Sequence, residues 1–106
     1  MVNVRFTGQA GSKPRPALVV GVEPFHRRLL DVTVCPVSSQ PRFFKRPGAG
    51  GHPLRCWKAV GLRHPSTVRI SNVLAVEKKL IRRVLGTLNA EDLAQVQHAL
   101  REAFGL

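Results

Sequence analysis

The sequence has few acidic residues and no long apolar run. Its 106 residues include 6 Asp and Glu against 17 Lys and Arg, which gives a formal net charge of +11. Such an imbalance favours a polyanionic partner: nucleic acid, an acidic protein or an anionic membrane surface. A membrane is disfavoured because no apolar run approaches the roughly 20 residues that span a bilayer. The first residues alternate in polarity, unlike the apolar core of a signal peptide, so we expect a cytoplasmic protein with no membrane partner.

Cysteine is also scarce, and this limits the metal chemistry. Cys35 and Cys56 are the only two cysteines, which favours reduced, packed thiols, with a single disulfide as the alternative. His52 lies four residues before Cys56, and His64 is a further candidate ligand. The second ligand pair that a Cys/His zinc site needs is missing. We therefore predict no metal and no cofactor.

The positive charge belongs to the body of the chain. A length of 106 residues predicts a single domain over 1–106. Residues 1–88 carry 16 basic and 3 acidic side chains, whereas residues 89–106 carry 1 and 3. The surface that meets a polyanion should therefore lie in the first 88 residues.

Apolar alternation and frequent turn signals predict many short strands. We expect strands over 2–7, 17–23, 29–37 and 54–60, short extended pieces over 67–70 and 73–76, a turn over 24–28, a basic loop over 38–53 with a short strand near 42–45, and a strand or helical turn over 79–85. With one helix at the end, this pattern indicates a mainly β fold: a small, strongly bent antiparallel sheet or barrel with a C-terminal α-helix on one face or end.

The predicted helix begins after Asn89 and ends at Gly105. Asn89 is a favourable N-cap, and Glu91 and Asp92 follow in the first turn, where the helix dipole favours anions. Glycine commonly ends a helix, as Gly105 would here. One apolar stripe follows the helical spacing: Leu93, Val96, Leu100 and Phe104. We expect this stripe to pack on the sheet.

A candidate anion site lies where the second strand begins. Pro14 and Pro16 flank Arg15 and make a rigid lead-in to the apolar segment 17–23. If segments 17–23 and 29–37 form a hairpin, Arg15 and Ser38 lie on the same rim of the sheet. A guanidinium there can hold a phosphate with two donors. The alternative is a solvated charge beside an ordinary turn.

The aromatic residues allow two interpretations. In the basic loop, Phe43 and Phe44 stand among Arg42, Lys45 and Arg46. This pattern suits single-stranded RNA, with cations on phosphates and rings stacked on bases, or alternatively two rings that belong partly to the core. For Trp57, the only tryptophan, packing against the sheet is favoured over base stacking.

Four segments in order resemble one known family. Residues 13–20 (Lys-Pro-Arg-Pro-Ala-Leu-Val-Val), 35–40, 66–81 and 86–93 resemble successive parts of the MazF/PemK family of toxins from bacterial toxin–antitoxin pairs. The resemblance extends from about residue 4 to the end, except for 40–58. It implies an SH3-like barrel of the MazF/PemK/CcdB type, a homodimer, and metal-independent endoribonuclease activity on single-stranded RNA by attack of the ribose 2′-hydroxyl. The basic surface then predicts an acidic antitoxin as partner, which would neutralise the toxin by competing with RNA for Arg15.

By position, the resemblance assigns Arg15 and Ser38 to the scissile phosphate and Arg69 to the leaving group or to charge stabilisation. The remaining residues assigned to RNA binding are Lys13, Ser39, Arg42, Phe44, Lys45 and Ser71. Ser71-Asn72 stands where the family commonly has Asp-Gln, and serine cannot replace an aspartate base unaided. His26 or His64 could take that role, with surface histidines as the alternative.

This departure keeps a second function open. The protein could be a non-catalytic binder on the same fold, either a toxin that poisons a protein target, as gyrase-directed toxins do, or an RNA-binding module that has lost cleavage. Substitution of Arg15 separates the two hypotheses, because only an enzyme would lose cleavage.

Overall fold

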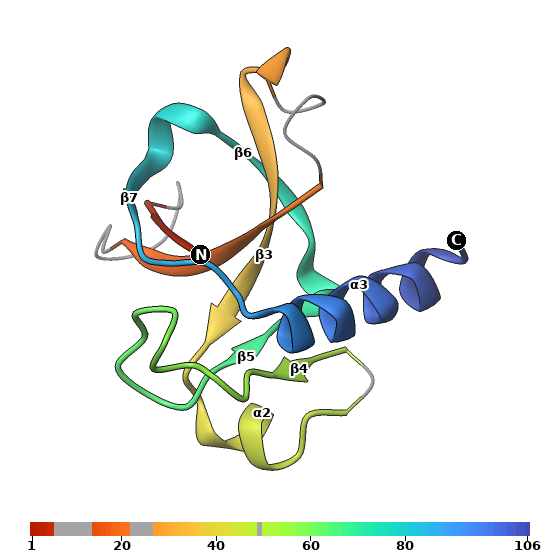
Figure 1. Cartoon of the computed structure of the whole chain (residues 1–106). Helices are drawn as coiled ribbons and strands as arrows, with labels where there is room; N and C mark the ends of the chain where they lie inside the picture. The colour runs from red at the N-terminus through yellow and green to blue at the C-terminus, as the bar shows by residue number, and fades with distance from the viewer. Residues whose placement is uncertain (6–13, 22–26, 49) are drawn as a thin grey trace.

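The computed structural model describes residues 1–5, 14–21, 27–48 and 50–106. In these ranges the chain forms short strands, one short helix, two 3-10 turns and one long helix (Figure 1). Their bounds are β1 (Val2–Val4), β2 (Arg15–Val20), β3 (Asp31–Ser38), α2 (Pro41–Lys45), β4 (His52–Pro53), β5 (Thr67–Val68), η1 (Ile70–Asn72), β6 (Leu74–Glu77), η2 (Lys78–Leu80), β7 (Ile81–Val84) and α3 (Ala90–Phe104). None of the helices described could cross a membrane, since none is both long and apolar enough.

Strand β3 organises the sheet. It pairs with β2 along one edge, and with β6 and then β5 along the other, always antiparallel. Beyond these neighbours, β4 pairs with β5, and β1 joins β2 to β7. The β2–β3 ladder extends from Ala17 opposite Pro36 to Val20 opposite Thr33. The predicted hairpin is therefore confirmed, while most of its turn over 24–28 lies outside the described residues.

The strands form a strongly bent sheet that does not close into a barrel. Figure 1 shows β7, β1, β2, β3 and β6 arranged around a ring. In the described residues, β6 and β7 form no ladder with each other, because the η2 turn joins them in place of a tight hairpin. The amide of Arg5 donates to the Leu80 carbonyl within this turn at 3.0 Å. The mainly β fold with a C-terminal helix is confirmed, and the SH3-like barrel that the resemblance implies is an open, strongly bent sheet in this chain.

Two hydrophobic clusters lie on opposite faces of β3. Successive side chains of a strand point to opposite faces, so Val32 and Val34 join one cluster and Cys35 and Val37 join the other. The ring cluster contains Val2, Val4, Ala17, Val32, Val34 and Val76. The helix-side cluster contains Met1, Leu18, Cys35, Val37, Leu54, Val60, Val68, Ile70, Leu88 and Val96. Both cysteines are free, and Cys35 is fully buried.

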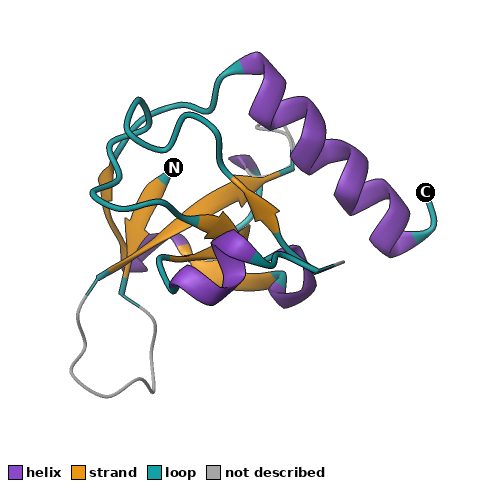
Figure 2. Ribbon diagram, turned by 90° about the horizontal axis from the view of Figure 1, so that it is seen from below, coloured by secondary structure: helices purple, strands orange, loops and turns teal. Residues whose placement is uncertain are grey.

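Helix α3 lies along one side of the strands (Figure 2). Its predicted ends are confirmed: the Asn89 side chain accepts from the Asp92 amide at 2.8 Å, and Gly105 adopts the left-handed conformation at φ 69°. The predicted apolar stripe is only partly right. Val96 is buried, but Leu93 and Phe104 are 40% and 59% exposed. Because the Asp92 carboxylate is buried, residue 92 and not residue 93 faces the sheet.

Two predicted strands are wrong. Residues 55–61 form turns, although Leu54 and Val60 are buried as strand-like spacing suggests. The segment predicted as a strand near 42–45 forms helix α2, with Pro41 at the first turn, where proline is well tolerated. The ambiguous segment 79–85 divides between η2 and β7. Trp57 packs against the helix-side cluster, which confirms its packing role.

Candidate nucleic-acid interface

Arg15 lies at the mouth of a cleft formed by the ends of three elements. It is the first residue of β2 and is exposed. The cleft, of about 370 Å³, is lined by Arg15, Pro16, Pro36, Val37, Asn72, Val73 and Leu74. We call it the Arg15 cleft. Prolines from β2 and β3 form rigid walls, since a proline ring fixes its own backbone angle. Arg15 and Asn72 supply the only side-chain hydrogen-bond donors of this lining.

Ser38 ends β3 at the same end of the hairpin. Continuing the β2–β3 register outward from Ala17 and Pro36 by two residues brings Arg15 level with Ser38. The Ser38 hydroxyl oxygen accepts from the Gln40 amide at 3.2 Å. This contact uses a lone pair and leaves the hydroxyl proton for an acceptor outside the chain. Ser38 itself does not belong to the lining of the Arg15 cleft.

Asn72 lines the cleft, and its neighbour Ser71 is hydrogen-bonded to it. The Ser71 amide donates to the Gly50 carbonyl at 3.1 Å, and its hydroxyl donates to Asn72 Oδ1 at 2.9 Å. The Ser71 hydroxyl therefore orients the neighbouring amide, and Asn72 is the residue that lines the cleft. The sequence assigned Ser71 to RNA binding and missed Asn72, although the departure from the family pattern at these two positions was the available signal.

Three predicted RNA-binding residues come together beside α2. Ser39, Phe44 and Lys45 line a depression of about 490 Å³ whose other walls are Pro41, His64 and Pro65. We call it the α2 pocket. His64 therefore lies with these residues and does not line the Arg15 cleft. Lys13 and His26 lie outside the described residues.

The guanidinium of Arg69 lies on the ring of Phe43. Its central carbon is 3.8 Å from the ring centroid, and that of Arg42 is 4.6 Å from the same centroid. Arg69 precedes η1, and its amide donates to the Pro36 carbonyl at 2.8 Å. Its main chain therefore adjoins the Arg15 cleft, while its side chain extends to α2. From the sequence, Phe43 could belong to the core or contact RNA. In the structure its ring is half-buried, and the guanidinium groups of two arginines pack against it.

Among the described residues, no carboxylate forms an ion pair with the cations around these sites. Within the described ranges, the ion pairs involve other basic residues: His52, Arg55, Lys79 and His98. Arg15, Arg42, Lys45 and Arg69 form none there. Arginines built next to one another without acidic partners attract an external anion, and their planar donors suit phosphate oxygens.

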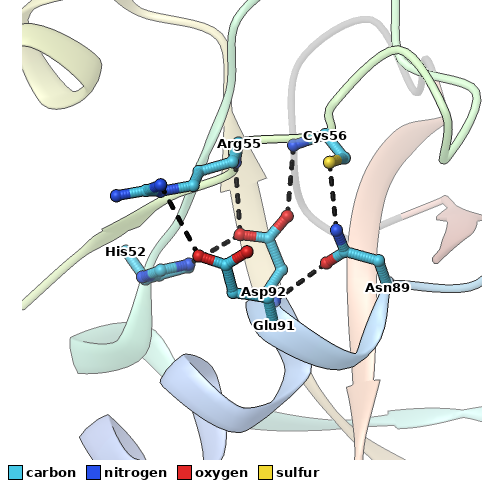
Figure 3. Close-up of polar contacts among 6 residues, drawn as sticks. All are labelled: His52, Arg55, Cys56, Asn89, Glu91 and Asp92. Atoms are coloured by element: carbon cyan, nitrogen blue, oxygen red, sulfur yellow. Dashed lines mark hydrogen bonds and ion pairs between the residues drawn. The ribbon is translucent and has the colours of Figure 1, made fainter.

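A cluster of polar side chains around Asp92 joins α3 to β4 and the segment that follows it (Figure 3). The Asp92 carboxylate, 1% exposed, accepts from His52 Nε2 at 3.1 Å and from the amides of Arg55 and Cys56, each at 3.2 Å. Burial by itself raises the pKa of Asp92, but these hydrogen bonds outweigh it and hold the pKa below its ordinary value. The Asn89 amide donates to Cys56 Sγ at 3.0 Å.

These contacts give the polar cluster around Asp92 a structural role. The His52 ring is bound to a buried carboxylate, and the Cys56 sulfur is engaged by the helix N-cap. In the described part of the chain, no three His, Cys, Asp or Glu side chains gather as a metal would require. The sequence identified Asp92 only as a first-turn acid and could not show that the helix is anchored through it.

A family model described as PemK-like, MazF-like toxin of type II toxin-antitoxin system matches residues 1–104. The chain belongs to the PemK/MazF toxin family. The match spans nearly the whole sequence, including the segment 40–58 for which the resemblance gave no counterpart. No curated protein sequence is similar enough to count as a match.

Solved structures of this family have the same fold. The chain is 26% identical to the Mycobacterium tuberculosis toxin MazF-mt6, with a TM-score of 0.78 over 99% of this chain and 95% of that one. It is 24% identical to MazF of Deinococcus radiodurans, with a TM-score of 0.76 over 99% and 92%. An endoribonuclease in complex with its cognate antitoxin, from a mycobacterial species, is 18% identical, with a TM-score of 0.78 over 99% and 90%.

Proposed function

We propose that the chain is a growth-inhibiting toxin that cleaves single-stranded RNA in the cytoplasm as a metal-independent endoribonuclease. The observation that carries the proposal is an exposed Arg15 that lines a cleft and has no acidic partner among the described residues, in a chain of the PemK/MazF toxin family. The net charge of +11 supports a polyanionic substrate.

The proposed reaction is an internal transesterification. The 2′-oxygen of the ribose attacks the adjacent phosphorus and loses its proton, and the bond from phosphorus to the 5′-oxygen breaks. The departing 5′-oxygen takes up a proton, so that the products are a cyclic phosphate and a 5′-hydroxyl end. The nucleophile belongs to the substrate, so this step consumes no water.

Arg15 and Ser38 stabilise the charge that develops on the phosphate. Arginine stays protonated in proteins, so the guanidinium serves as a fixed donor pair and not as a base. The Ser38 hydroxyl donates to the same phosphate from the end of β3. Removal of one such preorganised donor typically lowers the rate about 10²–10³-fold.

The test is incubation of the purified protein with a long single-stranded RNA in EDTA. We expect discrete fragments with 5′-hydroxyl ends, and their loss in Arg15→Ala at an unchanged melting temperature, because the side chain is exposed. Arg101→Ala, an exposed arginine in the last turn of α3, is the matched control and should cleave normally. Uncut RNA with the folded wild-type protein would contradict the proposal.

A second candidate is a non-catalytic binder on the same fold. The observation in its favour is that Ser71, at the position of the family's aspartate, donates its hydroxyl to Asn72 and supplies no carboxylate. RNA that is bound but uncut would support this alternative. In that case Arg15→Ala would weaken binding without any cleavage to lose.

We also propose a homodimer and an acidic antitoxin that covers the Arg15 cleft. Two relatives support the antitoxin: the mycobacterial endoribonuclease bound to its cognate antitoxin and the MazE–MazF complex of Deinococcus radiodurans. Complementary charge would speed this association. Full RNA affinity in the presence of saturating antitoxin would contradict the predicted overlap, and light scattering tests the dimer.

A further inference from the structure

We propose that Arg42, Phe43 and Arg69 form a second phosphate subsite, which holds a phosphate next to the scissile one along the RNA strand. This inference rests on the proposed function. It changes the role of Arg69 from a group at the reacting phosphate to a group that holds the strand. It also assigns Phe43 as the positioning residue for both arginines.

The first argument is the direction of the Arg69 side chain. The Arg69 amide is bound to the Pro36 carbonyl, and Pro36 lines the Arg15 cleft. Nevertheless, the Arg69 guanidinium lies 3.8 Å from the Phe43 centroid, in α2, and the side chain is absent from the cleft lining. A strand whose scissile phosphate meets Arg15 would therefore meet Arg69 at a neighbouring phosphate.

The second argument is the spacing of the two guanidinium groups. Since their central carbons lie 3.8 and 4.6 Å from one ring centroid, they are at most 8.4 Å apart. Two cations this close repel each other unless an anion or a π-system intervenes. Phe43 supplies the π-system, and none of the described carboxylates pairs with either arginine. The arrangement thus provides a preorganised set of donors for an anion.

The third argument is that burial and backbone hydrogen bonds hold Phe43 in place. Phe43 is half-buried, and its amide donates to the Gln40 carbonyl at 3.1 Å. The Arg46 amide donates to the Arg42 carbonyl at 3.0 Å, which closes the turn of α2. A guanidinium presents its N–H donors in a planar fork that suits phosphate oxygens, and lysine lacks this planar geometry.

Steady-state kinetics separate this role from a catalytic one. A contact to a flanking phosphate is made equally in the ground and transition states, so Arg69→Ala should raise KM about tenfold and leave kcat within about twofold. Phe43→Leu, which keeps apolar bulk but removes the ring, should raise KM severalfold, and Phe43→Tyr should restore it. Arg101→Ala serves as the control, because Arg101 is an exposed arginine in the last turn of α3 and lines neither the Arg15 cleft nor the α2 pocket.

A binding measurement tests the phosphate contact of Arg69 itself without cleavage, while the kinetic split assigns it to the flanking phosphate. The probe is a single-stranded DNA of the same sequence, which has no 2′-hydroxyl and cannot react. Arg69→Ala should reduce the slope of log affinity against log salt by about 0.7, as expected for one lost phosphate contact on a single strand. Arg101→Ala should leave that slope unchanged.

The outcomes distinguish the subsite from the proposed function. A fall in kcat at constant KM for Arg69→Ala would place the residue at the reacting phosphate and overturn the subsite. Wild-type KM and salt slope in Arg69→Ala and Phe43→Leu would also overturn it while leaving the ribonuclease intact. If the wild-type protein cuts no RNA, the ribonuclease fails, and a reduced salt slope on DNA would still support the subsite.

Discussion

Replacement of Asp92 should destabilise the protein far more than replacement of its neighbour Glu91. Asp92→Ala removes the acceptor of two amides, those of Arg55 and Cys56, and of the His52 ring. Each buried donor left without a partner costs about 1–3 kcal/mol, and water entering the gap recovers part of this. We expect a loss of about 2–4 kcal/mol in the free energy of unfolding.

Glu91→Ala is the matched control on the same helical turn. The Glu91–Arg55 pair is 3.5 Å long, and both side chains are mostly exposed, at 61% and 78%. An exposed pair of this kind contributes about 0–1 kcal/mol. In thermal melts, one kcal/mol corresponds to roughly 4–8 °C for a domain of about this size. Asp92→Ala should therefore melt roughly 10–20 °C lower than wild type, and Glu91→Ala only a few degrees lower.

The pH dependence tests the cause. The folded state holds the pKa of Asp92 below its ordinary value, so the stabilisation is fully present above the unfolded pKa of about 4. It is lost as the pH falls through the lower, folded pKa. The gap between wild type and Asp92→Ala should thus be wide at pH 7 and narrow below about pH 4. A gap that is independent of pH, or equal losses in both variants, would refute this reasoning.

The remaining predictions concern the two cysteines and two glycines with positive φ. Burial raises the pKa of the Cys35 thiol to about 11. Iodoacetamide at pH 8 should therefore label only Cys56 in the folded protein, which mass spectrometry can measure. Two labels without denaturant would contradict this prediction. Gly61→Ala should cost about 2 kcal/mol or more in urea unfolding, because residue 61 has φ 88° and its new Cβ would lie 2.9 Å from the Leu85 carbonyl oxygen. Gly105→Ala, at φ 69° with open space around it, should cost only about 1–2 kcal/mol, and equal losses would show that the Leu85 contact is unimportant.

The sequence predicted those elements whose signals are local. Asn89 and Gly105 mark the two ends of α3 because capping depends on residues within one turn. A continuous apolar run predicted β2 and an alternating segment predicted β3, with their ends displaced by about two residues. By contrast, the strand predicted over 54–60 is wrong. Leu54 and Val60 are both buried, but the residues between them form turns, since burial alone does not specify an extended backbone.

The candidate site was predicted in part for a similar reason. Arg15 and Ser38 follow from strand pairing, which fixes their shared end of the hairpin. The contact of Arg69 with Phe43 joins positions 26 residues apart that belong to no common ladder. No periodic pattern records such a contact. The sequence therefore placed Arg69 with Arg15, whereas the Arg69 side chain extends to α2.

The alternation of β3 ties the two halves of the molecule into one cooperative unit. Val32 and Val34 hold the ring cluster, and Cys35 and Val37 hold the helix-side cluster. Neither cluster can come apart while the other keeps β3 in place, because the same few peptide units support both. The amides of β3 should therefore exchange with deuterium only through global opening of the protein, whereas the exposed end of α3 near Phe104 can fray independently.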